Sequence, residues 1–573
     1  MTTASAPTPA PMPAPGVAAA TAAGTVLLTL SSAQFLMTLD SSVMNVSIST
    51  VAQDVGTSVT GIQTAITLYT LVMASLMITG GKLGEILSRK RAFAIGCVVY
   101  GVGSLTTSLA PNLAVLMIGW SLLEGMGAAL IMPAIVALVA SNFGRSERPR
   151  AYGLVAASGA IAVAAGPLIG GLLTTYASWR WVFAGEVLIV LVILLLTRRM
   201  VDVPANPDAK LDLVGTALSA TGLGLIVYGV LRSGSWGVVK PKPEAPVWLG
   251  TSPVVWLVLG GGAVLWLFMA WERRRLAAGR AALLDPALLR NRLLRGGLTA
   301  FFLQYLLQAG LFFCVPLFLS VALGLSAVAT GVRILPLSVT LLLAAVGIPK
   351  VWPDVSPRRV VRIGFLLLFA GITSLVAALD AGAGPQIVTG PLLLAGLGIG
   401  ALASQLGSVT VSSVPDESSA EVGGVQNTVT NLGASIGTAL AGAVLIAALT
   451  TSFFTGIQGN SAVPKDLADQ AQVTLSSGVP FVSDQQLEKG LADAGVDQQT
   501  SDAVMQENTA ARLAGLRASM FVLALLALGS LFLTGGIPTR QPGSEAAEAA
   551  EPVGPLPGTD PATGRSDGST GRA

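Results

Sequence analysis

Fourteen long apolar segments, separated by shorter polar ones, constrain the fold of this chain more than any other feature. A helix needs about 20 mainly apolar residues in a row to cross a lipid bilayer. In lipid the backbone can satisfy its own hydrogen bonds only in helices or closed barrels, and runs of this length suit helices. We therefore predict an all-α, polytopic membrane protein with 14 transmembrane helices, at residues 25–46, 62–80, 92–110, 113–140, 151–174, 181–200, 212–232, 253–271, 298–321, 330–349, 361–379, 388–413, 424–450 and 516–537.

Too few charged residues remain to build a large water-exposed surface. Asp, Glu, Lys and Arg make up 11% of the 573 residues, against roughly 25% in soluble globular proteins. This composition excludes an ordinary soluble enzyme and a nucleic-acid-binding protein. The absence of histidine excludes His-based metal sites and Ser-His-Asp catalysis. Cys97 and Cys314 both fall in apolar segments, so we expect no disulfide framework, no metal site and no cofactor.

The distribution of Lys and Arg predicts the orientation of the chain in the membrane. If the N-terminus is cytoplasmic, 24 of the 33 Lys and Arg residues fall on the cytoplasmic side and eight on the outer side. Cytoplasmic loops are enriched in these residues, so this bias indicates that both termini are cytoplasmic in the cell (plasma or inner) membrane. The first residues lack the pattern of a signal peptide. We expect disordered tails at 1–23 and 538–573.

A weak internal repeat suggests two related halves. Residues 80–96 and 347–364 both leave an apolar segment through glycine, pass a short polar turn and enter the next segment through a basic cluster. Secondary transporters commonly have such a plan. We therefore expect a six-helix half at 24–200, two linking helices at 201–296 and a second six-helix half at 297–537.

The second half contains a long polar outer loop at 451–515, with amphipathic stretches at 484–494 and 498–515 that we expect to be helices outside the membrane. The loop could be a partial lid over the protein or simply a tolerated insertion.

The segment between the second and third apolar runs carries a recognisable motif. Residues 81–91 read G-K-L-G-E-I-L-S-R-K-R, which resembles the loop signature of the major facilitator superfamily, except that Ser88 stands where glycine is usual. The resemblance implies a tight turn with a charge-paired cytoplasmic gate. The basic residues could instead serve only as positive-inside anchors. The candidate gating residues are Gly81, Gly84, Glu85, Arg89, Lys90 and Arg91.

The fifth apolar run resembles the antiporter helix of the same superfamily, which ends in G-P-x-[IL]-G-G. The matching residues are Gly159, Gly166, Pro167, Gly170 and Gly171. Small residues at this spacing let helices approach closely, and Gly-Pro in a helix produces a kink. In the family this helix is associated with exporters. It could also be a packing seam alone.

Further motifs are similar to those of the fourteen-span drug:proton antiporter branch of the superfamily. They are L-D-S-S-V-M-N-V at 39–46, W-R-W-V-F at 179–183 and the small-residue run at 424–437. The fourth apolar run departs from the branch, because Ser121 replaces its usual Arg and Glu124 its usual Gln. The role of that Arg therefore cannot be carried over to this chain. Glu186 stands where the branch usually has Asn.

Three acids within apolar runs carry most of the functional hypothesis. Asp40, Glu124 and Glu186 fall in the middle or outer half of their predicted helices and could lie at similar depth around one cavity. A charge near the bilayer centre costs at least about 2.5–3.5 kcal/mol, which makes such residues functional candidates. They could bind protons or substrate, or be protonated structural acids. Arg333, in the tenth run, could pair with an acid or with substrate, or lie at the membrane interface.

A binding cavity for lipophilic compounds would also need aromatic and methionine side chains. The candidates are Met44, Tyr69, Met73, Phe302 and Tyr305, although each could equally be a packing residue.

The resemblance implies a proton-driven antiporter that exports small amphipathic or cationic compounds, with protons, substrate and lipid as its partners and a monomer as its state. The alternatives are a proton-coupled uptake symporter and a non-transporting receptor or scaffold. The chain lacks a G-x-x-x-x-G-K-[ST] loop, which disfavours an ATP-driven pump.

Overall fold

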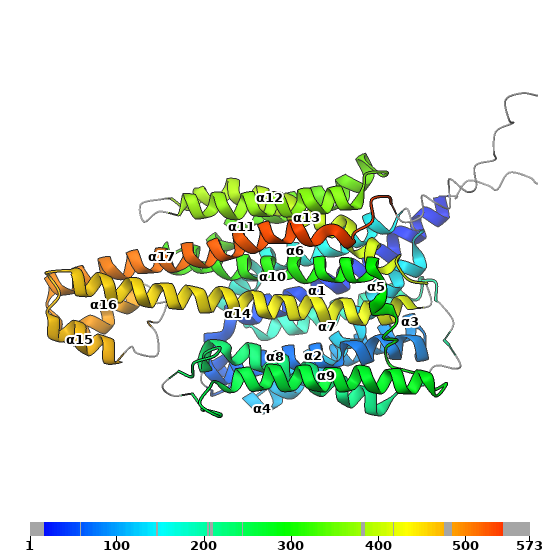
Figure 1. The fold of residues 1–573 in the computed structure, drawn as a ribbon, viewed down its shortest axis with the longest axis horizontal. Coiled ribbons are helices and arrows are strands. Elements are labelled where there is room, and N and C mark those ends of the chain that lie inside the picture. The colour runs from blue at the N-terminus through cyan, green and yellow to red at the C-terminus, as the bar shows by residue number, and fades with distance from the viewer. Residues whose placement is uncertain are drawn as a thin grey trace, which may run out of the picture.

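The computed structural model describes residues 17–57, 59–144, 147–202, 205–206, 210–242, 245–379, 384–415, 418–474, 479 and 484–541. Throughout these residues the regular elements are helices, with one isolated β-bridge between Trp248 and Thr251. Most of the long helices run roughly side by side (Figure 1). The predicted tails lie largely outside the described residues, but the first helix already begins at Val17 rather than near residue 24.

The first half of the chain forms six rods. The fourth of these is a single rod built from three segments, α4, the π-helix η1 and α5, which follow one another without a gap. The helices of the first half are α1 (Val17–Asp54), α2 (Val59–Leu87), α3 (Arg89–Ser108), α4 (Leu113–Leu116), η1 (Met117–Glu124), α5 (Gly125–Asn142), α6 (Arg148–Tyr176) and α7 (Arg180–Thr197).

Two linking helices follow, and then six more rods. The linking helices are α8 (Leu213–Trp236) and α9 (Pro253–Ala277), after which comes the short turn η2 (Leu288–Arg290). The second half comprises α10 (Arg292–Leu317), continued by the π-helix η3 (Phe318–Ala322), α11 (Ala327–Val351), α12 (Pro357–Ala378), η4 (Pro385–Val388), α13 (Thr389–Val411), α14 (Ser419–Gly459) and α17 (Gln498–Ser530), continued by η6 (Leu531–Gly536).

Each of the fourteen predicted spans coincides with a helix. Thirteen helices among the described residues are long and apolar enough to cross a membrane. The remaining predicted span is α3, whose 20 residues begin with three consecutive basic residues. Its exposed apolar side chains, Ile95, Val98, Val102 and Leu105, form a surface suited to lipid.

The predicted outer loop is shorter than expected, because the helices on both sides of it extend beyond the bilayer-length segments. α14 continues to Gly459 and α17 already begins at Gln498. Between them lie α15 (Lys465–Thr474) and α16 (Asp484–Asp493). Figure 1 shows these two short helices at one end of the molecule, beyond the ends of most other rods.

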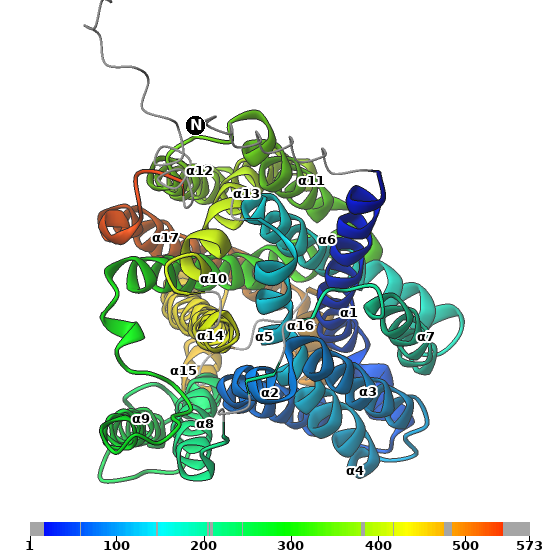
Figure 2. The same cartoon turned by 90° about the vertical axis from the view of Figure 1, so that its right-hand side faces the viewer.

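Small residues bring neighbouring rods close together. A Cβ atom at Gly437 of α14 would lie 2.1 Å from the Leu306 carbonyl oxygen of α10, so only glycine fits there. Each half has its own apolar core, one centred on α10–α14 and α17 and the other on α1, α3, α5 and α6. Of the linking pair, α8 packs against α2 and α14, and α9 packs against α8 (Figure 2). The space between the two halves is therefore bounded partly by α8.

Candidate functional site

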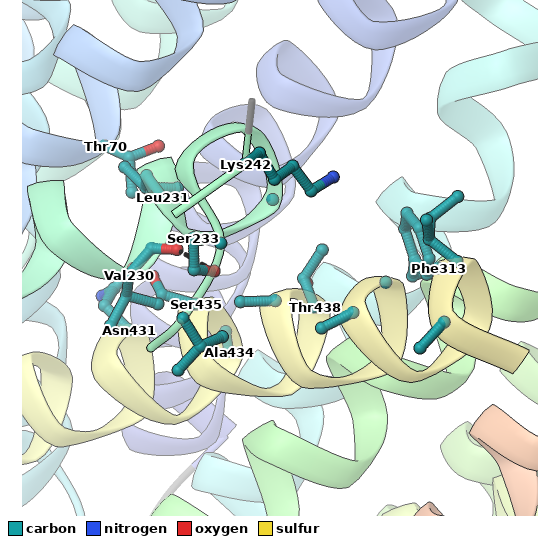
Figure 3. A pocket seen from close by; sticks show the side chains of 18 of the residues that line it. Thr70, Val230, Leu231, Ser233, Lys242, Phe313, Asn431, Ala434, Ser435 and Thr438 are labelled. Carbon is teal, nitrogen blue, oxygen red and sulfur yellow. Dashed lines mark hydrogen bonds between the residues drawn. The ribbon is translucent and has the colours of Figure 1, made fainter. Parts of the chain in front are cut away.

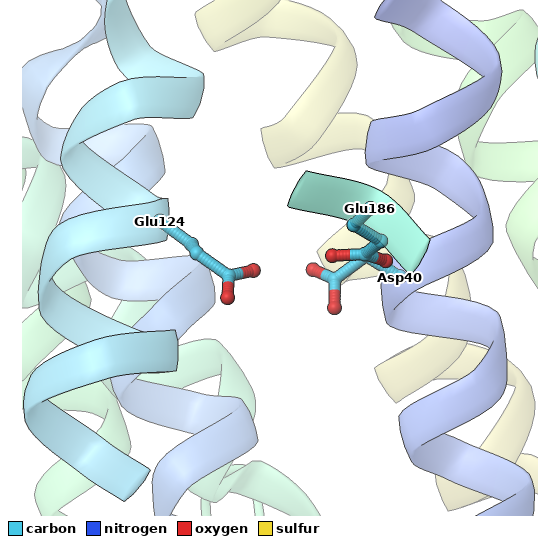
Figure 4. Close-up of side chains that lie close together, drawn as sticks. All are labelled: Asp40, Glu124 and Glu186. Carbon is cyan, nitrogen blue, oxygen red and sulfur yellow. The ribbon is translucent and has the colours of Figure 1, made fainter. Parts of the chain in front are cut away.

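The fold brings the three intramembrane acids of the first half together. Asp40 lies on α1, Glu124 is the last residue of η1 and Glu186 lies on α7, and each is at most 1% exposed. One carboxylate oxygen from each lies within 4.8 Å of the others. Figure 4 shows their carboxyl groups converging from three helices. We call these three residues the carboxyl cluster.

Trp120 is the principal hydrogen-bond donor to Asp40. Its indole N–H donates to both carboxylate oxygens, at 2.8 Å and 2.9 Å. Trp120 precedes Glu124 by four residues, and η1 therefore supplies both a donor and an acid to the cluster. π-Helical segments are rare and occur often at functional sites. The ring of Tyr69 stacks on Trp120, with centroids 5.1 Å apart and planes 4° from parallel.

One face of α3 supplies the hydroxyl groups for the other two acids. The Ser104 hydroxyl donates to Glu186 Oε2 at 2.8 Å, and the Tyr100 hydroxyl lies 3.5 Å from the same oxygen. Thr107 donates to Glu124 Oε1 at 3.2 Å. Glu124 Oε2 and Glu186 Oε1 are buried without a hydrogen-bond partner among the described residues. The cluster therefore has unused capacity for a proton or another ligand.

The chemistry of the cluster favours a proton over a metal ion. Carboxylate oxygens are the ligands that Ca²⁺ and Mg²⁺ prefer, but these ions take about six or more of them. Both oxygens of Asp40 already accept from the Trp120 N–H group. Like charges within 4.8 Å of one another in a low-dielectric interior repel strongly. A bound proton removes one of these charges without requiring further ligands.

A large cavity adjoins the cluster. Its volume is about 960 Å³, which is at the upper end of the range for small-molecule sites. It lies between both halves and the linking helix, and its walls come from α1, α2, α8, α10, α14 and the segment after α8 (Figure 3). Tyr69 belongs to the cavity wall and also stacks on Trp120. Ser41, next to Asp40 in the sequence, lies on the same wall.

The two halves approach closely at one end of the molecule, near the basic loops. A Cβ atom at Gly153 of α6 would lie 2.4 Å from the Ala345 carbonyl oxygen of α11, and one at Gly424 of α14 would lie 2.9 Å from the Met77 carbonyl oxygen of α2. The large cavity lies toward the opposite end of α2 and α14. This conformation is thus closed at the basic end.

Comparison with known proteins identifies the family. The sequence profile of the Major Facilitator Superfamily matches residues 30–438. The chain belongs to this superfamily.

The puromycin resistance protein pur8 of Streptomyces alboniger is 31% identical over 424 residues, covering 72% of this chain and 80% of pur8. The probable actinorhodin transporter of Streptomyces coelicolor is 29% identical, covering 81% of this chain and 78% of that protein. The human organic anion transporter MFSD10 has a similar fold, with a TM-score of 0.53 at 13% identity, covering 89% of this chain and 99% of MFSD10.

The segment that carries the superfamily loop signature is almost entirely helical, contrary to the expected loop. α2 continues through Gly81, Gly84 and Glu85 to Leu87, and α3 begins at Arg89. The turn is Ser88 alone, with φ 81° and ψ 148°. This region of backbone space is one that essentially only glycine adopts without strain.

Hydrogen bonds hold Ser88 in this conformation. Its hydroxyl donates to Asp202 Oδ2 at 2.8 Å and accepts from the Arg91 N–H at 3.3 Å. The Lys90 backbone N–H donates to Asp202 Oδ1 at 3.2 Å, and its ammonium group donates to the carbonyl oxygens of Arg198 and Met200. These hydrogen bonds stabilise Ser88 in a backbone conformation that the glycine of the usual superfamily signature would adopt without strain.

The acid of the loop signature pairs locally. Glu85 accepts from the Lys82 ammonium group at 2.7 Å and from Asn206 at 3.1 Å. Arg89 is buried, and its guanidinium donates to the Ala137 carbonyl oxygen of α5. The segment therefore connects α2 and α3 to α5 and to the chain after α7.

The glycines of the expected antiporter helix lie along α1. α6 is one continuous helix from Arg148 to Tyr176, through Pro167. A Cβ atom at Gly166 would lie 2.4 Å from Ser42 Cβ, and one at Gly170 would lie 2.9 Å from Val43. Gly159 faces Gln34 and Thr38 of α1. Gly171 follows on the same helix. The seam thus fixes the part of α1 that carries Asp40.

Arg333 is not part of the carboxyl cluster. It lies near the start of α11, half buried, and α11 packs on α6 and α13. Of the candidate cavity residues, Tyr69 and Met73 line the large cavity, and Tyr305 lines a smaller one of about 130 Å³ between the halves. Met44 is buried in packing, and Phe302 packs against the core of the second half.

Sequence reasoning missed the donors to the cluster and the part that α8 plays in the cavity. Tyr100, Ser104 and Thr107 lie at helical spacing, which puts them on one face of α3. The sequence could have shown that these three residues share a face, but it could not show that this face meets Glu124 and Glu186. Trp120 precedes Glu124 by four residues, a spacing that puts both side chains on the same face of a helix.

Proposed function

We propose that this protein is a proton-driven antiporter that exports small amphipathic compounds by alternating access between its two halves. The observation that carries the proposal is the contact chain from Asp40 through Trp120 to Tyr69 on the cavity wall. A change in the protonation of Asp40 changes what the Trp120 N–H donates to. A shift of the Trp120 indole is then passed to the cavity wall through the ring of Tyr69, which stacks on it.

The names of similar proteins support export. They include a cephamycin export protein of Amycolatopsis lactamdurans and a tetracenomycin C resistance and export protein of Streptomyces glaucescens. The seam between α6 and α1 supports the same direction of transport, since the superfamily associates this helix with exporters. We infer transport rather than catalysis, with no cofactor, and a monomer as the working unit.

The distribution of basic residues supports an orientation with both termini in the cytoplasm. The end at which the halves meet is then the cytoplasmic one, so this conformation is outward-facing. In alternating access, the contacts between α6 and α11 and between α2 and α14 would open in the other half of the cycle.

The carboxyl cluster gives the proton a defined place in this cycle. From the outward-facing state, a proton that enters from outside neutralises one of three crowded acids and lowers their mutual repulsion. Opening to the cytoplasm at higher pH then releases it. Substrate would leave the cavity when the cluster is protonated and enter it when the cluster has lost its proton.

The test is transport by the purified full chain in proteoliposomes, with anilinonaphthalene sulfonate, N-phenylnaphthylamine and tetraphenylphosphonium as probes. An imposed pH gradient should drive accumulation of at least one probe, and a protonophore should abolish it. Asp40→Asn should eliminate the gradient-driven component. Asp54→Asn is the matched control, because Asp54 lies on the same helix and accepts from the Trp179 indole outside the cluster.

Three results would count against the proposal. Gradient-driven accumulation by Asp40→Asn at the wild-type rate would remove the assigned role of Asp40. Movement of probe and protons in the same direction would indicate a symporter. Probe binding without gradient-driven movement would indicate a receptor. In cells, drug susceptibility of an efflux-deficient host, with and without protonophore, checks the same export.

A further inference from the structure

The large cavity contains one charged side chain among its described lining residues, and that residue is Lys242. The acids of the carboxyl cluster are at most 1% exposed and do not line the cavity. We propose that Lys242 is a specificity-determining residue that makes the cavity favour uncharged and anionic amphipathic compounds over cations. This inference rests on the proposed export function and narrows its substrate class.

Lys242 is held at the cavity by the segment between α8 and α9, of which residues 237–242 and 245–252 are described; we call these described residues the strap. The strap starts at Gly237, whose φ of +80° and close approach to the Lys240 carbonyl oxygen require glycine. The Lys242 N–H donates to the Trp236 carbonyl oxygen at 3.1 Å. At the other end, the Ser252 hydroxyl donates to the Gly237 carbonyl oxygen at 2.6 Å. The strap is thus anchored at both ends.

The side chain of Lys242 extends over the cavity from this strap. Figure 3 shows its ammonium group reaching across the space between Leu231 of α8 and Phe313 of α10, above Thr438 of α14. Lysine is a compact point charge on a flexible stem of four carbons. It can therefore follow ligands of different shape while keeping its charge near the cavity.

The rest of the described wall supplies neutral contacts. Tyr69 and Phe313 present aromatic rings, and Asn431, Ser435 and Thr438 present amide and hydroxyl groups along α14. Neutral groups of this kind hydrogen-bond to polar substituents without favouring either sign of charge. Among the described lining residues, Lys242 is therefore the one whose charge can favour one sign of ligand charge over the other. The class of compound that fits is aromatic, with polar substituents, and either uncharged or negatively charged.

The competing interpretation is that Lys242 only anchors the strap at the membrane surface. Lysine side chains commonly extend from apolar surroundings toward the interface. In that case the residue would affect the strap but not the discrimination between probes that differ only in charge. A set of probes with a common ring system separates the two interpretations.

The experiment measures equilibrium binding of two probes to the purified full chain in lipid nanodiscs, with empty nanodiscs as the blank. Anilinonaphthalene sulfonate and N-phenylnaphthylamine share a ring system and differ by one sulfonate. Lys242→Gln should weaken binding of the sulfonate about fivefold, as expected for a partly exposed charge pair. Binding of the uncharged amine should stay within about twofold. Raising the salt concentration should shrink the difference between wild type and Lys242→Gln.

Two further variants sharpen the test. Lys240→Gln is the matched control, because Lys240 lies on the same strap, is exposed and does not line the cavity. It should leave the binding of both probes unchanged. Lys242→Glu should weaken sulfonate binding further and strengthen the binding of tetraphenylphosphonium.

Equal loss of both probes in Lys242→Gln would overturn the proposal, because a structural role of the strap predicts it. So would a wild-type protein that prefers tetraphenylphosphonium to the sulfonate. Binding is measured without a proton gradient, so the result does not depend on export. Charge-selective binding in a protein that fails the transport test would reject the proposed function and leave this inference standing.

Discussion

The indole N–H of Trp120 lies 2.8 Å and 2.9 Å from the two carboxylate oxygens of Asp40, in a region where both residues are at most 1% exposed. The same indole stacks face to face on Tyr69, which lies on the wall of the large cavity. One side chain therefore contacts both the acid that we assign to the proton and a ring that faces the cavity.

This contact predicts the effect of Trp120→Phe. Phenylalanine keeps an aromatic ring for Tyr69 but removes the donor to Asp40. A hydrogen bond to a charged group contributes about 1.5–3 kcal/mol, so we expect the rate of proton-driven probe transport to fall by at least about tenfold. Probe binding should change much less, because the cavity wall remains. Transport in proteoliposomes and binding in nanodiscs measure the two effects separately.

A second tryptophan–aspartate pair provides the control. Trp179 donates to Asp54 Oδ2 at 2.9 Å, outside the carboxyl cluster. Trp179→Phe removes the same type of hydrogen bond and should leave proton-driven transport close to that of the wild type. If both phenylalanine variants lose transport equally, the effect of Trp120→Phe is one of general stability rather than of coupling.

The two glutamates of the cluster predict a property of the transport cycle. The branch that this sequence resembles usually has Gln and Asn at these positions, so Glu124→Gln with Glu186→Asn leaves Asp40 as the one acid of the carboxyl cluster. We expect the double variant to carry fewer protons per exported molecule while still transporting. The measurement is the pH gradient at which net probe flux is zero. An unchanged gradient would mean that neither glutamate exchanges protons.

The same double variant should also be more stable than the wild type. Crowded buried acids repel one another in a low-dielectric interior, and the double variant replaces two of the three with neutral amides. We expect this gain to exceed the cost of the methylene that Glu186→Asn removes. The melting temperature in detergent measures this. A lower melting temperature would indicate that hydrogen bonds from Ser104 and Thr107 outweigh the repulsion.

The sequence was sufficient to predict the helices and to single out three acids that the structure brings together, for physical reasons that apply locally. Apolar length defines a span, and the cost of a charge in lipid makes Asp40, Glu124 and Glu186 conspicuous. The rotation of each helix about its axis depends on packing against distant helices, so the Trp120 donor could not be predicted. The position of Lys242 depends on the strap hydrogen bonds between Gly237 and Ser252, which periodicity does not reveal.

The turn between α2 and α3 shows a different limit of sequence reasoning. Its glycines suggested that the tight turn lies at Gly81 and Gly84, but helix α2 continues through both and the reversal falls on Ser88. The Asp202 carboxylate that holds Ser88 lies 114 residues away in the sequence. A local sequence pattern cannot predict a contact between residues that are so far apart in the sequence.

Ser88 predicts a contrast between two substitutions. Ser88→Ala loses the hydrogen bonds to Asp202 and Arg91 and keeps the strained backbone, so we expect it to destabilise the protein by about 1–3 kcal/mol. Ser88→Gly loses the same bonds but relieves strain of about 1–3 kcal/mol, so its stability should stay near that of the wild type. Thermal unfolding of the two variants measures the difference. Equal stability of the alanine and glycine variants would show that Ser88 stores no strain.

The seam between α6 and α1 predicts how tightly Asp40 is positioned. In Gly166→Ala the added Cβ would lie 2.4 Å from Ser42 Cβ, so α1 must move away from α6. Overpacking of this kind costs about 1–3 kcal/mol, and it displaces the helix that carries Asp40. We expect a lower melting temperature and weaker proton coupling. Gly262→Ala on α9 is the control, because its Cβ would meet no atom within 4 Å. It should be neutral or slightly stabilising, since alanine favours the helix by about 1 kcal/mol. A Gly166→Ala protein with wild-type coupling would show that the cluster tolerates movement of α1.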